Sequence, residues 1–330
     1  MLKTLLRNRR LAGKEARSLS DDLNKERQPV GATLKVLILG GHGFIGRHAA
    51  KHLAIAGADV TVGTRNPRAD STFRQARCRL EERQSRADWA QDVEQYDVIL
   101  NCVGILRQRR GESYEAIHHL APQALAQACH AAQKRFVHVS ALGLSADCKS
   151  RFLTSKYHGE RAIMASQGDW IIARPSLLEG DGGFGAEWLR AIAKLPVFVV
   201  PASAKGNIAA LTVDDAGVAL ARLCLGDASE IGLDHSRIYE LGGAKALSFE
   251  HYIRALHSRY SDKNAVCLSV PGWIARAAAH LFDVIHFSPF SFGHWELLCK
   301  DNVPDENRLP SLLQHQADDP VLAYAADKTA

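Results

Sequence analysis

The sequence predicts an α/β fold, in which a doubly wound parallel sheet is joined to a smaller α+β C-terminal region. Two observations predict it. Short apolar runs alternate with helical patterns as far as Ser140, which is typical of right-handed βαβ crossovers. After Ser176 the pattern becomes irregular and its segments shorten. We therefore expect a flexible basic leader over residues 1–33, a sheet domain over 34–175, and a smaller region over 176–330 interleaved with it.

A glycine motif follows the first apolar run. Leu34–Leu39 reads LKVLIL, which is typical of a strand buried on both faces. Gly40, Gly43 and Gly46 follow at G-x-x-G-x-x-G spacing, and the pattern then becomes helical. The first glycine permits a tight turn, the second lets a pyrophosphate approach the backbone, and the third lets the helix lie close to the sheet. The motif in this context predicts a Rossmann-type dinucleotide site, with phosphate at the helix N-terminus.

The residues after the second expected strand, Asp59–Gly63, indicate which cofactor is preferred. NAD-preferring sites usually place Asp or Glu there, whereas this chain has Thr64 and Arg65. Together with Arg47, Arg65 could flank a 2′-phosphate and bind it through bidentate hydrogen bonds. The sequence therefore predicts NADP(H) in preference to NAD(H). The alternative is that Arg65 is a solvated loop charge.

Composition excludes several functional classes. With 330 residues, 46% hydrophobic and 23% charged, the chain is globular and long enough for a substantial core. Its net charge of +5 is modest, and the basic cluster over Arg65–Arg86 borders the expected nucleotide site, so we expect no nucleic-acid partner. Seven cysteines without a C-x-x-C pair argue against a disulfide framework or a zinc knuckle. No apolar run is long enough for a transmembrane segment.

The leader has two interpretations. MLKTLLRNRRLAGKEARSL is rich in arginine and nearly free of acid, which is typical of transit peptides. Acidic residues follow soon after, at Asp21, Asp22 and Glu26, so a flexible leader is favoured over a targeting or membrane-surface segment. We expect a cytoplasmic chain, with a peripheral position on the inner membrane as one option. The alternative, if the leader is a transit peptide, is the mitochondrial matrix.

Further elements follow from the same patterns. Strands are expected over 97–104, 136–140 and 170–173, and helices over 87–94, 112–132 and 214–225. Residues 74–80 have the composition of a poor strand. Residues 180–185 are expected to form a flexible glycine-rich loop that could cover a ligand. The apolar helix expected over 271–287 includes Trp273, Leu281 and Phe287. We expect it in the core, with a surface-docking helix as the alternative.

Five motifs in order carry a resemblance to a known family: GGHGFIGR, NCVGIL, HVSALG, FLTSKYHGE and IIARPSLLEG. With the C-terminal FSPFSFGHWELLCKDNV, the chain resembles an atypical, extended-type short-chain dehydrogenase/reductase of the NAD-dependent epimerase/dehydratase kind. It is most similar to the group of the NAD(P)H-binding accessory subunit of respiratory complex I and its bacterial relatives. The resemblance covers roughly residues 34–313. The cofactor-binding residues expected from the motifs and from the resemblance are Gly40, Gly43, Phe44, Ile45, Gly46, Arg47, Arg65, Val103, Gly104, Ser140, Lys156, Pro175 and Ser176.

The catalytic set of that superfamily is incomplete here. Its enzymes carry Tyr-x-x-x-Lys on a helix and a Ser or Thr after an earlier strand, so that Lys lowers the pKa of the Tyr that donates a proton. This chain keeps Ser140 and Lys156 but has Phe152 in place of the Tyr. Tyr157 is no substitute, because adjacent residues point about 100° apart on a helix. We expect intact nucleotide binding without the general acid.

His48 and His52 lie four residues apart on the first expected helix, a spacing that can chelate a metal. No third ligand is evident nearby, so we expect packing or solvated histidines and no metal site.

These observations favour an NAD(P)H-binding scaffold or assembly factor linked to a respiratory or quinone-related complex, with a membrane-associated protein complex as partner. One alternative is an active NADP-dependent oxidoreductase or epimerase in which water, Ser140 or a substrate group supplies the proton. A second alternative is a redox sensor whose partner affinity depends on the bound nucleotide.

Overall fold

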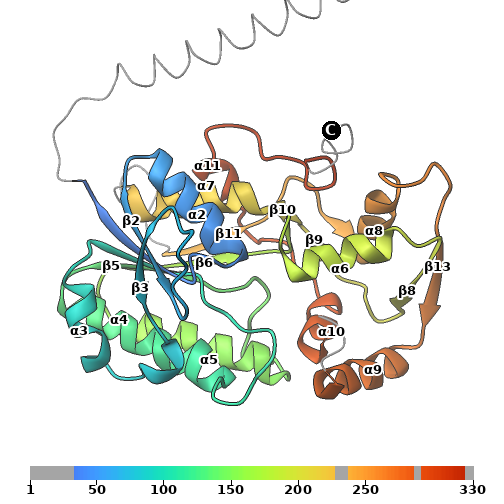
Figure 1. Cartoon of the computed structure of the whole chain (residues 1–330). Helices are drawn as coiled ribbons and strands as arrows, with labels where there is room; N and C mark the ends of the chain where they lie inside the picture. Colours follow the sequence, from blue (N-terminus) through green and yellow to red (C-terminus); the bar gives the residue numbers. More distant parts are fainter. Residues whose placement is uncertain (1–32, 227–236, 286–290, 324–330) are drawn as a thin grey trace, which may run out of the picture. The chain divides into compact units, whose positions relative to one another are not determined.

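A seven-stranded parallel sheet forms the centre of the fold (Figure 1). The computed structural model describes residues 33–226, 237–285 and 291–323. In spatial order the strands are β11 (Ile238–Leu241), β6 (Trp170–Pro175), β5 (Arg135–Val139), β4 (Val98–Asn101), β1 (Lys35–Leu39), β2 (Asp59–Thr64) and β3 (Arg74–Arg77). All neighbouring strands are parallel. The chain order reverses between β1 and β4, which is where doubly wound sheets bind ligands.

Helices cover both faces of this sheet, as a doubly wound fold requires (Figure 1). One face carries α2 (Phe44–Ile55), α7 (Val213–Leu225) and α11 (Leu309–Leu312). The other carries the 3₁₀ turn η1 (Leu80–Glu82), α3 (Ala87–Val93), the π-helix η2 (Glu115–Leu120), α4 (Ala121–Ala131) and α5 (Arg151–Ala165). The expected fold class is confirmed.

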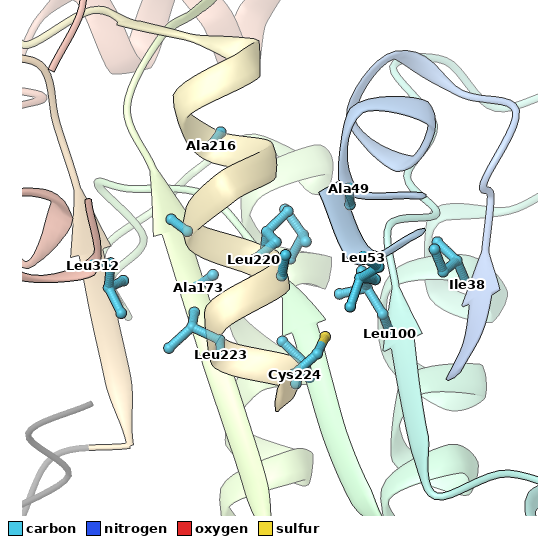
Figure 2. Close-up of a cluster of buried hydrophobic side chains, with 14 of the residues drawn as sticks. Ile38, Ala49, Leu53, Leu100, Ala173, Ala216, Leu220, Leu223, Cys224 and Leu312 are labelled. Atoms are coloured by element: carbon cyan, nitrogen blue, oxygen red, sulfur yellow. The ribbon is translucent and has the colours of Figure 1, made fainter. Parts of the chain in front are cut away.

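The core on the first face depends on a close approach of α2 and α7. Figure 2 shows Leu220, Leu223 and Cys224 of α7 pointing towards the sheet beside Leu53 of α2. A Cβ at Gly217 would lie 2.9 Å from the backbone of α2, so glycine lets the two helices pack closely. Because α7, α11 and β11 come from the C-terminal half of the sequence, that half is interleaved with the Rossmann core.

The remaining elements form a smaller α+β region. Its helices are α6 (Phe184–Ala193), α8 (Phe249–His257), α9 (Gly272–Ile285) and α10 (Phe292–Leu298). Its strands pair in twos: β7 (Leu178–Glu179) with β10 (Leu211–Thr212), β9 (Asn207–Ile208) with β12 (Leu247–Ser248), and β8 (Val197–Pro201) with β13 (Val266–Val270). The apolar sides of α6 and α8 pack against Phe198 and Val200 of β8.

Two expected elements differ from the structure. Residues 74–77 do form a strand, because β3 is an edge strand that pairs with β2, and its charged side chains face solvent. The expected helix over 112–132 begins at Glu115, and its first six residues are π-helical. Pro122 follows directly in α4 and lacks the N–H that an α-helix would bond to the carbonyl of His118.

The expectation that the apolar helix over 271–287 lies in the core is wrong for its large residues. Trp273 and Leu281 of α9 are 73% and 57% exposed, whereas Ala275 and Ala279 are buried. Helix α9 therefore buries its small residues and turns large ones to the surface. Phe287 lies outside the described residues.

A buried ion pair fastens α5 to the sheet. Glu160 of α5 is fully buried and accepts hydrogen bonds from Arg174 of β6, with Nε to Oε1 at 3.0 Å. The same guanidinium lies 3.5 Å from Oε1 of Glu240 on β11. One arginine thus joins a helix and two adjacent strands.

Glu160→Gln is expected to lower the free energy of unfolding by about 3 kcal/mol, because it leaves the charge of Arg174 buried without its main partner. Urea denaturation measures this change. Glu82→Gln is the matched control, since its partner Arg79 is on the surface, and its effect should stay below about 1 kcal/mol. Equal losses in the two variants would contradict the role given to the buried pair.

Candidate functional site

The glycine turn after β1 has the geometry that its sequence predicts. Gly40 has a φ of +74°, which strains residues that carry a Cβ. A Cβ at Gly46 would lie 2.3 Å from the Gly40 oxygen, so a glycine is needed for α2 to pack this closely. Gly43 is the N-cap of α2, and the helix has no side-chain cap and no acid in its first turn. Its first N–H groups are therefore available to an anion, favoured by the helix dipole.

A cavity of about 570 Å³ opens beside this turn, at the carboxyl ends of β4, β5 and β6. Most of the predicted site residues line it: Gly43, Phe44, Ile45, Val103, Gly104, Ser140, Lys156, Pro175 and Ser176. Of the others, Gly40 and Gly46 shape the turn, whereas Arg47 and Arg65 contact neighbouring loops.

Lys156 and Ser140 bring polar groups to the cavity from α5 and from the end of β5. Lys156 is 9% exposed, and its burial lowers the pKa of the ammonium group to about 8, although the charge of Glu160 opposes this shift. Ser140 is also buried, and its hydroxyl has no hydrogen-bond partner among the described residues. The site therefore presents one cation and one unpartnered hydroxyl to a molecule in the cavity.

Phe152 lies one turn before Lys156 and lines the same cavity. The Nζ atom of Lys156 is 6.0 Å from the centre of the Phe152 ring. Three further rings surround it, those of Tyr114, His118 and His294, with centroid distances of 5.8, 5.5 and 6.0 Å. An apolar ring thus stands where the resembled family has its proton donor.

His118 is a neighbour of the site that sequence reasoning missed. Its Nε2 accepts the N–H of Ile105 at 3.1 Å, which leaves Nδ1 to donate to the Ser155 hydroxyl at 3.0 Å. Burial, together with the charge of Lys156, lowers the pKa of His118 well below its ordinary value. The imidazole is therefore neutral at pH 7, with both nitrogens engaged. The sequence carries no signal of this contact. His118 and His119 are adjacent on the same expected helix, and nothing in the pattern indicates which of the two is buried.

Arg47 and Arg65 are engaged by two different loops. Arg47 donates to the Asp181 carbonyl, and its guanidinium lies 5.6 Å from the centre of the Phe44 ring. Arg65 forms an ion pair with Glu112. Sequence reasoning missed this carboxylate, because it comes from a distant loop and not from the end of β2.

The glycine-rich loop over 180–183 lies against the start of α2. A Cβ at Gly183 would lie 2.6 Å from the Phe44 ring. Arg190 of α6 donates to the carboxylate of Asp181 at 2.6 Å, and Gly182 donates its N–H to Glu187 of α6 at 2.9 Å. The expected covering loop is therefore tethered to α6.

His48 and His52 both face Asp214 of α7. Oδ1 of Asp214 is 3.1 Å from Nδ1 of His48 and 3.0 Å from Nε2 of His52. Within the described ranges, no group of three or more His, Cys, Asp or Glu side chains could hold a metal ion. The two histidines join α2 to α7.

Comparison with known proteins finds relatives that are similar to part of this chain. A ceramide reductase of Caulobacter vibrioides is 28% identical over 192 residues, which are 57% of this chain and 60% of that protein. The mitochondrial NADH dehydrogenase (ubiquinone) 1 alpha subcomplex subunit 9 of Mus musculus is 30% identical over 156 residues, 43% of this chain and 40% of the relative. The chain thus spans about half the length of these curated relatives. They confirm the resemblance expected from the motifs.

Solved structures share the fold at low identity. An NADPH-dependent quinone oxidoreductase from Escherichia coli, complexed with NADPH, has a TM-score of 0.64 at 16% identity and covers 87% of this chain and 97% of its own. A dTDP-4-dehydrorhamnose reductase from Bacillus anthracis, in complex with NADP, has a TM-score of 0.58 at 16% identity, covering 88% and 96%.

Two findings complete the comparison. Among the helices in the described part of the chain, none is long and apolar enough to cross a membrane. The profile of the NAD(P)H-binding family matches residues 40–213, which is more than half of the sequence and includes the glycine turn, Ser140 and Lys156. The chain therefore belongs to the NAD(P)H-binding family.

Proposed function

We propose that this protein holds NADPH as a nucleotide-binding scaffold in a respiratory or quinone-related complex, without the turnover typical of its superfamily. One observation carries the proposal. The glycine turn, Ser140 and Lys156 line one cavity, whereas the position of the proton donor is filled by Phe152. This arrangement supports dinucleotide binding by these residues, and the phenol that would act on a second substrate is missing.

Each residue has a definite task in this proposal. The N–H groups at the start of α2 bind the pyrophosphate, because they are uncapped and lie at the positive end of the helix. Lys156 binds the hydroxyls of the nicotinamide ribose. Arg65 exchanges Glu112 for the 2′-phosphate, a dianion that a guanidinium binds more strongly than a carboxylate on the surface. Bound NADPH would supply a hydride at the nicotinamide.

The partner is proposed from the relatives. One of them is named as a subunit of mitochondrial NADH dehydrogenase (ubiquinone). A role as a nucleotide-holding subunit or assembly factor requires no catalytic phenol, which agrees with Phe152.

A second candidate function is an active reductase, favoured by the state of Lys156 and Ser140. The pKa of Lys156 is lowered to about 8, so its ammonium group is a stronger acid than an ordinary lysine and can give a proton to a carbonyl oxygen. The Ser140 hydroxyl, which has no partner among the described residues, could hold that oxygen. The proposals differ in whether wild-type protein turns over a carbonyl substrate.

Arg65→Ala is expected to weaken NADPH binding by about tenfold or more and to leave NADH binding unchanged, because a charge-assisted hydrogen bond contributes about 1.5 to 3 kcal/mol. Glu112→Gln should strengthen NADPH binding, since it frees the guanidinium. Isothermal titration calorimetry with both dinucleotides measures these changes. Arg74→Ala is the matched control, because Arg74 also pairs with a carboxylate, that of Asp59 at the other end of β2. Equal affinity of the wild type for NADPH and NADH would contradict the preference.

Phe152→Tyr is expected to produce weak reductase activity, because it restores a phenol one turn from Lys156. A positioned general acid typically contributes about 10²- to 10⁴-fold in rate. The assay is NADPH oxidation, followed by absorbance with a panel of carbonyl substrates, and adding Lys156→Met should abolish the gain. Tyr157→Phe is the control and should change nothing. Robust turnover by the wild type would overturn the scaffold proposal and favour Lys156 or Ser140 as the proton source.

A further inference from the structure

The cavity continues past Ser140 and Lys156 into the smaller α+β region. There its walls come from α6, α8 and α10 and from the segments between them. The side chains on this stretch of the wall are apolar: Leu177, Trp188, Leu189, Phe249, Leu297 and Leu298. Among the described residues that line the whole cavity, Lys156 is the only lysine, arginine, aspartate or glutamate.

The other polar side chains at this end already have protein partners. The Ser176 hydroxyl donates to Asn302, with its oxygen 2.7 Å from both the backbone and the side-chain oxygen. The side-chain amide of Asn302 donates to the Leu142 carbonyl at 3.0 Å. The Nδ1 atom of His294 lies 2.7 Å from the hydroxyl oxygen of Ser291. Ser140 differs from these groups, because its buried hydroxyl has no partner within the described structure.

This distribution of polarity defines the chemistry of a ligand. A nucleoside diphosphate carries two or more negative charges, and burying them without paired cations costs several kcal/mol. Lys156 alone cannot pair them all, particularly when it also binds the nicotinamide ribose. An uncharged molecule with one oxygen and a long apolar body meets no such cost, because its body only displaces water from apolar walls.

We infer that the cavity is a binding site for an uncharged, long-chain lipophilic ligand with a carbonyl or hydroxyl head. The head accepts from or donates to Ser140 beside Lys156, and the chain lies between α6, α8 and α10. This inference rests on the proposed function in one respect, namely that the nicotinamide of bound NADPH lies next to the head of the ligand. The walls that take the chain come from α6, α8 and α10, and not from the residues of the glycine turn.

Phe184 marks the opening of this site. It is the first residue of α6 and lines the cavity, yet it is 60% exposed. The tethered loop over 180–183 leads directly into it. A ligand chain that enters here passes this ring, so a charge at Phe184 should repel the chain while the fold tolerates the change at an exposed position.

The test is a homologous series of methyl ketones, 2-octanone, 2-decanone and 2-dodecanone, with UDP-glucose as the polar comparison. Binding to the full chain is measured by displacement of Nile red, with and without NADPH. We expect the affinity to rise about fourfold for each added methylene, the ratio that follows from transferring one methylene out of water. UDP-glucose should displace no dye.

Phe184→Glu should weaken binding of 2-dodecanone at least tenfold. Leu322→Glu is the matched control, since Leu322 is 64% exposed and is not part of the cavity lining; it should bind like the wild type. Three results would each overturn the inference. They are a ketone affinity that does not depend on chain length, a higher affinity for UDP-glucose than for the ketones, and a Phe184→Glu variant that binds 2-dodecanone as tightly as the wild type. Ketone binding without NADPH binding would reject the proposed function and leave the lipophilic site standing.

Discussion

The contact between Glu160 and Arg174 determines where the site residues of α5 lie. Glu160 is one turn after Lys156 and two turns after Phe152, so the ion pair that fastens it to β6 also sets the depth of both residues in the cavity. It sets their electrostatics as well, because Glu160 supplies the attraction that opposes the burial of Lys156. Without that carboxylate, the lysine would lose its proton more readily.

Most of the fold could be predicted because its signals are local. The run LKVLIL and the three glycines specify a strand, a turn and a helix through backbone sterics alone, and the structure has all three. What the sequence left open depends on contacts between distant segments. The pairing of Arg65 with Glu112 joins loops 47 residues apart, and His118 is buried where the π-helix η2 packs against Ser155 of α5. The exposure of α9 was missed because an apolar composition does not say which face has a neighbour.

Three buried ionisable groups, Lys156 of α5, His138 of β5 and Glu179 of β7, make stability depend on pH in opposite directions. The folded pKa of Lys156 is about 8 against an ordinary 10.5, so the unfolded chain binds more protons between these values and stability rises with pH there. Burial lowers the pKa of His138 from 6.5 to about 3, so stability is lost as pH falls below 6.5. Burial raises the pKa of Glu179 from 4.5 to about 7, and its contribution is therefore lost as pH rises through that window.

The rings around Phe152 explain why this position tolerates an apolar residue. The Tyr114 hydroxyl donates to the Leu106 carbonyl at 2.9 Å, and both nitrogens of His118 are engaged with Ile105 and Ser155. These neighbours therefore gain nothing from a hydroxyl at 152, and a phenyl ring leaves none of these groups unsatisfied. A hydroxyl at this position would find its partners on the other side, in Lys156 and the cavity. The fold therefore does not require a phenol at position 152, because the polar groups around Phe152 have their partners without it.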